Sequence, residues 1–174
     1  MKKYILIYGA IAGVVVICSM ILGIVAADGE GTTASEAFGY LIMLIAFSLI
    51  FVAIKQYRDK EQGGILRFSQ GVLLGIGVSA VAGVAYVIVW EIYLNVSNYA
   101  FINDYAAAIL EQAKASGISD TDYAEKVAQM EQMKIDYANP VRRLPMTFLE
   151  IFPVGVLVTL ISAGILRKSD ILPA

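Results

Sequence analysis

Four long apolar segments constrain the fold of this chain more than any other feature. They cover residues 4–27, 38–54, 68–93 and 146–166. As a helix the first segment would be roughly 36 Å long, enough to cross a hydrocarbon core about 30 Å thick, while the second, at about 26 Å, is near the lower limit. The sequence therefore predicts an all-α integral membrane protein with four transmembrane helices.

Composition supports the same fold class. Hydrophobic residues make up 59% of the chain and charged residues 16%, against about a quarter charged in a soluble domain. The formal net charge of −2 gives no argument for a nucleic-acid partner. The single cysteine, Cys18, excludes an intrachain disulfide, and the absence of histidine removes the commonest general base and metal ligand.

The first apolar segment has two interpretations. It follows Lys2 and Lys3, and its last residues, 25–27, are small enough to form a signal-peptide cleavage site. The apolar core of a signal peptide, however, has only about 7–15 residues. We therefore expect a retained helix.

Residues 94–145 form a mostly polar insert between the third and fourth segments. Apolar residues recur at helical spacing in two stretches of it: Ile102, Tyr105, Ala106, Ile109 and Ala113, then Tyr123, Val127, Met130, Met133 and Tyr137. Between the stretches, Gly117 suits a helix C-terminus, and Ser119 with Asp122 suits an N-cap. We predict a helical hairpin too small for an independent core, which packs on the membrane domain or on a partner.

Basic residues predict the orientation. Eight of the thirteen fall on one side of a four-span chain: Lys2, Lys3, Lys55, Arg58, Lys60, Arg67, Arg167 and Lys168. The other side holds the acidic loop at residues 28–36 and the insert. Because cytoplasmic loops are enriched in Lys and Arg, both termini are predicted to be cytoplasmic and the insert periplasmic. Arg142 and Arg143 oppose the rule locally.

Small residues predict how the spans pack, because membrane helices associate where their backbones approach closely. The third span has four at every fourth position: Gly71, Gly75, Ser79 and Gly83. The first and fourth spans also carry small residues: Gly9, Gly13, Gly155, Thr159 and Ala163. The second span has large ones instead, among them Phe47 and Ile50. We expect a tight bundle of the first, third and fourth spans, with the second more peripheral.

Glu91 and Glu150 are the candidate functional residues, since a carboxylate within a span is costly. Both lie near the outer ends of their predicted spans, about 3 Å and 6 Å along the helix, so the cost is small here. One interpretation is a structural clasp, in which these acids pair with Arg142 or Arg143 or accept a hydrogen bond from Tyr93. The other is ion or proton binding. Pro153 is either a plain kink or a source of exposed carbonyl groups that coordinate a cation beside Glu150.

Motifs for catalysis, cofactors or metals are missing. Asp120, Asp122 and Glu125 lack the glycine and the distal glutamate of a calcium loop, and helix capping explains them better. No phosphate-binding loop, Gly-x-Ser-x-Gly or His-Glu-x-x-His pattern is present. The sequence therefore predicts neither enzymatic activity nor a cofactor or metal.

Several short motifs place charged and aromatic residues in otherwise generic apolar sequence. They are GYLIMLIA at 39–46 running into IKQYRD at 54–59, WEIY at 90–93, MEQMK at 130–134 and MTFLEIFPVG at 146–155. With these motifs the chain resembles a family of small bacterial inner-membrane proteins known as domain of unknown function 4199. The resemblance covers nearly the whole chain and implies a four-span protein of a Gram-negative inner membrane. It implies no activity.

We therefore expect an accessory or protein-interaction component of the inner membrane. Its partners would be the lipid bilayer and a protein bound through the insert. The alternative is a small transporter or ion-conducting subunit that uses Glu91 and Glu150. The sequence does not predict the oligomeric state.

Overall fold

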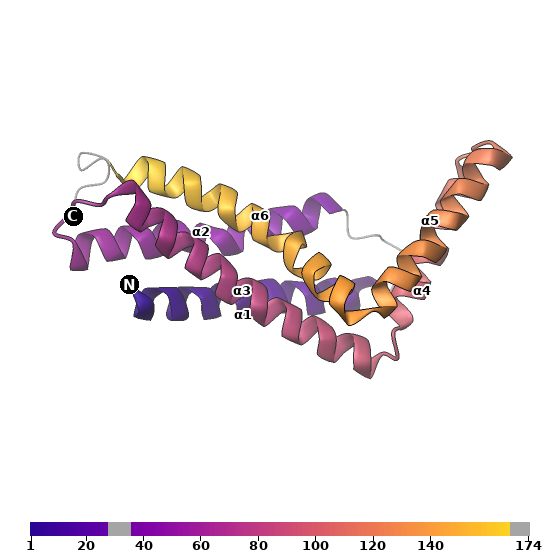
Figure 1. Cartoon of the computed structure of the whole chain (residues 1–174), viewed down its shortest axis with the longest axis horizontal. Helices are drawn as coiled ribbons and strands as arrows, with labels where there is room; N and C mark the ends of the chain where they lie inside the picture. The colour runs from indigo at the N-terminus through magenta and orange to yellow at the C-terminus, as the bar shows by residue number, and fades with distance from the viewer. Residues whose placement is uncertain (28–35, 168–174) are drawn as a thin grey trace. The chain divides into compact units, whose positions relative to one another are not determined.

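All the regular secondary structure in the part of the chain that the structure describes is helical. The computed structural model describes the backbone of residues 1–27 and 36–167, and the side chains of residues 1–21 and 40–167. The helices are α1 (Lys2–Ala27), α2 (Glu36–Glu61), α3 (Phe68–Val96), α4 (Ala100–Ala115), α5 (Asp120–Ala138) and α6 (Pro140–Leu166) (Figure 1). Four of them, α1, α2, α3 and α6, are long and apolar enough to cross a membrane. The predicted all-α class is confirmed. Of the predicted acidic loop, residues 28–35 lie outside the described residues, as does Lys168.

All four of these long helices extend beyond their predicted spans, α2 and α6 by the most residues. α2 continues to Glu61, and Lys55 and Asp59 pair across one turn of this polar extension at 2.6 Å. The helix stops before Gly63 and Gly64, whose φ angles of +63° and +87° suit glycine. α6 begins at Pro140, six residues before position 146.

The early start of α6 has a local cause. The Asn139 side chain accepts the backbone N–H of Val141 at 3.0 Å and so caps the helix. Pro140 occupies the first helical position, where its missing N–H removes no hydrogen bond.

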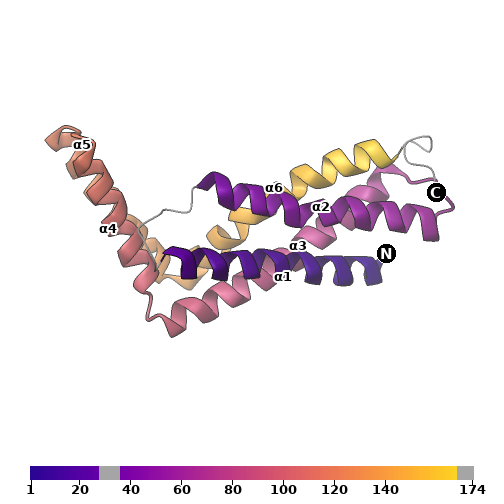
Figure 2. The same cartoon turned by 180° about the vertical axis from the view of Figure 1, so that it is seen from behind.

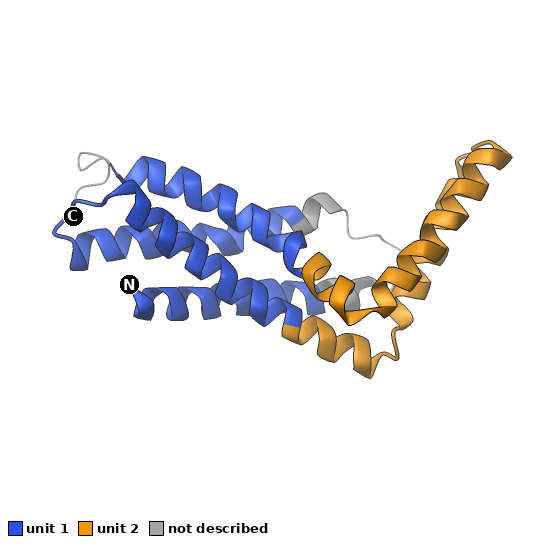
Figure 3. Cartoon of the chain, viewed as in Figure 1, with its two compact units in different colours: residues 1–87, 148–174 blue, residues 88–147 orange. Residues whose placement is uncertain are grey.

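The chain divides into two compact units, which Figure 3 shows in different colours. The first contains Met1–Val87 and Phe148–Ala174, and the second contains Ile88–Thr147. Both α3 and α6 contribute to each unit.

In the first unit, α3 packs against α6 through small residues. A Cβ atom added to Gly71 would lie 2.9 Å from the Cβ of Ala163, and one on Gly75 would lie 2.5 Å from Thr159 Oγ1. A Cβ atom on Gly155 would lie 2.5 Å from Ser79 Oγ. Along this row of contacts the residue number increases by four on α3 as it decreases by four on α6. The two helices therefore run antiparallel with their backbones close together.

A second face of α3 receives α1. Gly9 lies against Val81, where an added Cβ would be 2.6 Å from the Cβ of that valine. Gly13 lies against Ala85 at 3.1 Å by the same measure. Here the residue numbers increase together on both helices, so α1 and α3 are parallel. α3 is thus packed on two faces.

The expectation that the second span is peripheral is wrong. Five residues of α2 are 0–1% exposed and belong to the core of the first unit: Ala46, Phe47, Ile50, Ala53 and Ile54. A Cβ atom on Gly155 would lie 3.3 Å from Phe47 Cε1. A large side chain on α2 therefore fills the space beside the small residues of the α3–α6 contact. α2 also packs against α1, and Figures 1 and 2 show the two helices side by side.

In the second unit, α4 and α5 pack against each other as an antiparallel pair. The turn between them has the predicted caps: Gly117 has a φ of +67°, and the Ser119 hydroxyl accepts the Asp122 N–H at 3.2 Å. The predicted apolar stripes supply the buried residues, Ile102 and Ala106 on α4 and Met130 and Tyr137 on α5.

Gly75→Ala tests the close approach of α3 and α6. The added methyl group meets Thr159, so we expect a loss of about 1–3 kcal/mol in the free energy of unfolding in detergent micelles. Gly164→Ala is the matched control, because an added Cβ has no neighbour within 4 Å there and alanine is the better helix former. Equal stability of the two variants would contradict the packing of Gly75.

Candidate functional site

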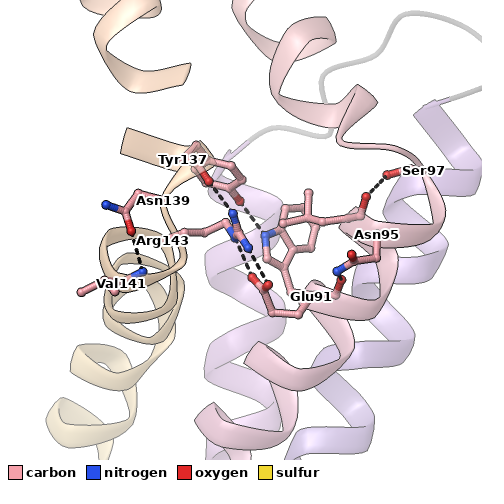
Figure 4. A network of polar contacts seen from close by, with 9 residues as sticks. Glu91, Asn95, Ser97, Tyr137, Asn139, Val141 and Arg143 are labelled. Atoms are coloured by element: carbon pink, nitrogen blue, oxygen red, sulfur yellow. Dashed lines mark hydrogen bonds and ion pairs between the residues drawn. The ribbon is translucent and has the colours of Figure 1, made fainter. Parts of the chain in front are cut away.

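The second unit contains an ion pair between α3 and α6. Arg143 donates from Nε to Glu91 Oε1 and from Nη2 to Glu91 Oε2, each at 2.7 Å (Figure 4). The Arg143 side chain is 2% exposed and the Glu91 side chain is 23% exposed. Two parallel bonds from one guanidinium fix both the distance and the orientation of the carboxylate.

Tyr137, at the end of α5, supplies further contacts to the same guanidinium. Arg143 Nη1 donates to the Tyr137 backbone carbonyl at 2.6 Å. That carbonyl lies in the last turn of α5, where a helix lacks its own donors. The guanidinium carbon also lies 5.2 Å from the ring centre of Tyr99 and 6.0 Å from that of Tyr137, within the range of cation–π attraction.

Aromatic residues extend this network to α4. The Trp90 indole N–H donates to the Tyr137 hydroxyl. The Trp90 ring meets that of Phe101 edge-on, with centroids 4.8 Å apart, and lies 5.4 Å from that of Tyr93. Glu91 of α3 and Tyr137 of α5 therefore meet the buried guanidinium of α6, and Trp90 connects Tyr137 to Phe101 of α4. We call Glu91, Arg143, Tyr137 and Trp90 the arginine clasp.

The turn between α3 and α4 carries backbone strain beside the clasp. Asn98 and Tyr99 have φ angles of 50° and 59°, a left-handed region that costs a bulky residue about 1–2 kcal/mol. The Tyr99 N–H donates to the Leu94 carbonyl at 2.9 Å, which closes the turn. The strained conformation sets the Tyr99 ring against Arg143.

The structure separates the four candidate residues that the sequence grouped together. It pairs Glu91 with Arg143, whereas the Arg142 side chain is 59% exposed and pairs with Asp136. Glu150 belongs to the first unit, is exposed, and accepts a hydrogen bond from Tyr86. The roles of Tyr99 and Tyr137 were not predicted.

A groove of about 450 Å³ opens between α4 and α5 near their connecting turn. Apolar residues in its lining are Ile109, Ala113 and Ile118, and charged ones are Asp122, Glu125 and Lys126. Glu91 and Glu150 do not line it. Within the described residues, no three His, Cys, Asp or Glu side chains are grouped to hold a metal.

Comparison with known families identifies the chain. Residues 7–168 match the family described as protein of unknown function (DUF4199). The chain belongs to this family. The resemblance expected from the short motifs is thus confirmed, and the match includes every residue of the arginine clasp. No curated protein and no solved structure matches the chain.

A double-mutant cycle tests the clasp. Glu91→Gln and Arg143→Gln each leave one buried charge without its counter-ion, so we expect each to lower the free energy of unfolding by about 3–5 kcal/mol. The double variant should lose less than the sum, with a coupling of about 0.5–3 kcal/mol.

Arg142→Gln is the control for this cycle. It removes an exposed ion pair, so we expect a loss of about 0–1 kcal/mol in the same detergent. Strictly additive effects of the Glu91 and Arg143 substitutions would contradict the clasp.

Proposed function

We propose that this protein is a multi-pass component of a bacterial inner membrane whose α4–α5 pair binds a partner protein outside the cytoplasm. It acts as an accessory or interaction protein, without catalysis and without a cofactor. The observation that carries this proposal is the groove at the end of the α4–α5 pair, with apolar residues in its lining and charges of both signs.

The exposed surface of the long helices supports membrane insertion. On α1 large apolar side chains face outward, including Leu6, Ile7, Ile11 and Val14. Soluble monomers rarely expose a contiguous apolar surface of this kind. A lipid bilayer removes it from water without a protein partner.

The charge distribution supports the orientation. Tyr4 donates to Glu61 at 3.2 Å, which brings the start of α1 to the end of α2. The Gly71–Ala163 contact does the same for the start of α3 and the end of α6. Exposed basic residues gather at this end of the first unit: Lys2, Lys3, Lys60, Arg67 and Arg167. By the positive-inside rule it faces the cytoplasm.

One basic residue differs from its prediction. Arg58 is one of the eight residues on which the predicted orientation rests, but its side chain is buried and pairs with Asp59 at 2.7 Å. Its charge is therefore neutralised inside the protein, and the orientation rests on the exposed basic residues.

The chemistry of the groove suggests how a partner would bind. Ile109, Ala113 and Ile118 offer a site for an apolar side chain, and the surrounding carboxylates and lysine offer donors and acceptors. A buried apolar anchor with a polar rim is the usual anatomy of a protein interface. The transport alternative is weaker, because Arg143 engages both carboxylate oxygens of Glu91.

Site-specific crosslinking in native membranes tests the partner proposal. A photoreactive residue at Gln112 or Gln129, both in the groove lining, should crosslink to one and the same protein. Ile118→Asp should reduce that crosslink at least tenfold by placing a charge in the apolar lining. A photoreactive residue at Ala107, exposed on α4 outside the groove, is the control. Equal crosslinking from Ala107 would refute the proposal.

Cysteine accessibility tests the orientation. In a Cys18→Ala background, a membrane-impermeant maleimide should label Lys114→Cys in intact spheroplasts and leave Lys60→Cys unlabelled until the membrane is broken. Both lysines are exposed, so side-chain burial does not explain a difference. Labelling of Lys60→Cys in intact spheroplasts would show that the orientation is the opposite of the one proposed.

A further inference from the structure

One exposed face of α6 is apolar except for a single carboxylate. Leu149, Pro153, Leu157 and Leu160 are exposed and recur at spacings of three and four residues, so they share one side of the helix. Glu150 is exposed beside them. Leu149 and Leu157 are 59% and 56% exposed, so the described residues of the first unit do not cover this face.

The polar groups on this face are mostly acceptors. The Glu150 carboxylate has two oxygens and receives a hydrogen bond from the Tyr86 hydroxyl of α3. Pro153 has no N–H, so the Leu149 carbonyl lacks the donor that a helix normally supplies four residues later. A ligand for this face must therefore bring donors.

The position of Glu150 within the membrane makes hydrogen-bond acceptors without donors costly. Glu150 precedes Leu166, the last residue of α6, by sixteen residues, or roughly 24 Å along the helix. Measured from that end, Glu150 lies within a hydrocarbon core about 30 Å thick. A carboxylate facing lipid at such a depth is unfavourable and is a default sign of a functional contact. Between Leu149 and Leu160, none of the exposed residues of α6 is basic.

We propose that this face binds a transmembrane helix of a partner protein that carries one lysine or arginine in its outer third. The cation donates to the Glu150 carboxylate and the Leu149 carbonyl, while Leu157 and Leu160 pack against apolar residues of the partner helix. This surface is distinct from the α4–α5 groove, and the inference rests on the proposed membrane insertion of α6.

A second copy and a dissolved cation fit the same face less well. A parallel second copy would bring Glu150 against Glu150 and would add acceptors where donors are needed. A dissolved cation would have to leave water for a face whose neighbouring side chains are exposed leucines.

A designed peptide tests the inference. The protein, labelled with a donor fluorophore, is reconstituted in liposomes with an acceptor-labelled leucine-rich helix of about 24 residues that has one arginine in its outer third. We expect the arginine peptide to associate at least tenfold more tightly than the same peptide with leucine there. Glu150→Gln should abolish this difference, and Glu150→Asp should largely retain it. Glu111→Gln, which removes an exposed carboxylate from α4, is the matched control and should have no effect.

Each other result overturns the inference. Equal association of the two peptides, or association unchanged in Glu150→Gln, excludes a cation-bearing helix. Energy transfer between two labelled copies that Glu150→Gln removes would assign the face to a second copy. Sodium or proton flux that Glu150→Gln removes would assign it to an ion. Maleimide labelling at Lys60→Cys and Lys114→Cys in the same liposomes separately tests membrane insertion. If the two cysteines are labelled from opposite sides but no peptide associates, the partner-helix inference is rejected and the proposed insertion stands.

Discussion

The close packing of α3 on two faces is the interaction on which the first unit depends. Between helices in lipid there is little hydrophobic driving force, so association relies on the many weak attractions that follow from close contact. Gly75 and Ser79 allow α6 to approach, and Val81 and Ala85 receive Gly9 and Gly13 of α1. Because both faces of α3 are used, a larger residue in either row disturbs a contact that its neighbours cannot replace.

The second unit is held by polar contacts of another kind. Burying Arg143 costs solvation free energy that one ion pair does not reliably recover. Here the guanidinium also satisfies the Tyr137 carbonyl and lies within about 6 Å of two aromatic rings. Such a group favours one arrangement over others, because every other arrangement leaves a buried charge without its partners. Its main effect is therefore on specificity.

The sequence predicted the contacts that repeat and missed those that depend on single side-chain orientations. Rows of small residues on α3 and α6 show in the sequence because helical periodicity places them on one face. The burial of Phe47 does not show, because a large residue on an apolar helix can equally face lipid. Arg142 and Arg143 are neighbours, so only the helix phase set by Asn139 decides which one meets Glu91. The left-handed turn at Tyr99 also lacks a signal, since no glycine marks it.

Asn139 is the only residue between α5 and α6, and it serves both helices. Its N–H donates to the Asp136 carbonyl at the end of α5, and its side chain accepts the Val141 N–H at the start of α6. Both hydrogen bonds at this connection are therefore made by the same residue. The first turn of α6 also carries Arg143, which binds Glu91 of α3, so the end of α5 is linked through Asn139 to the ion pair. A substitution at this one asparagine would therefore disturb the end of one helix, the start of the next and the placement of the arginine together.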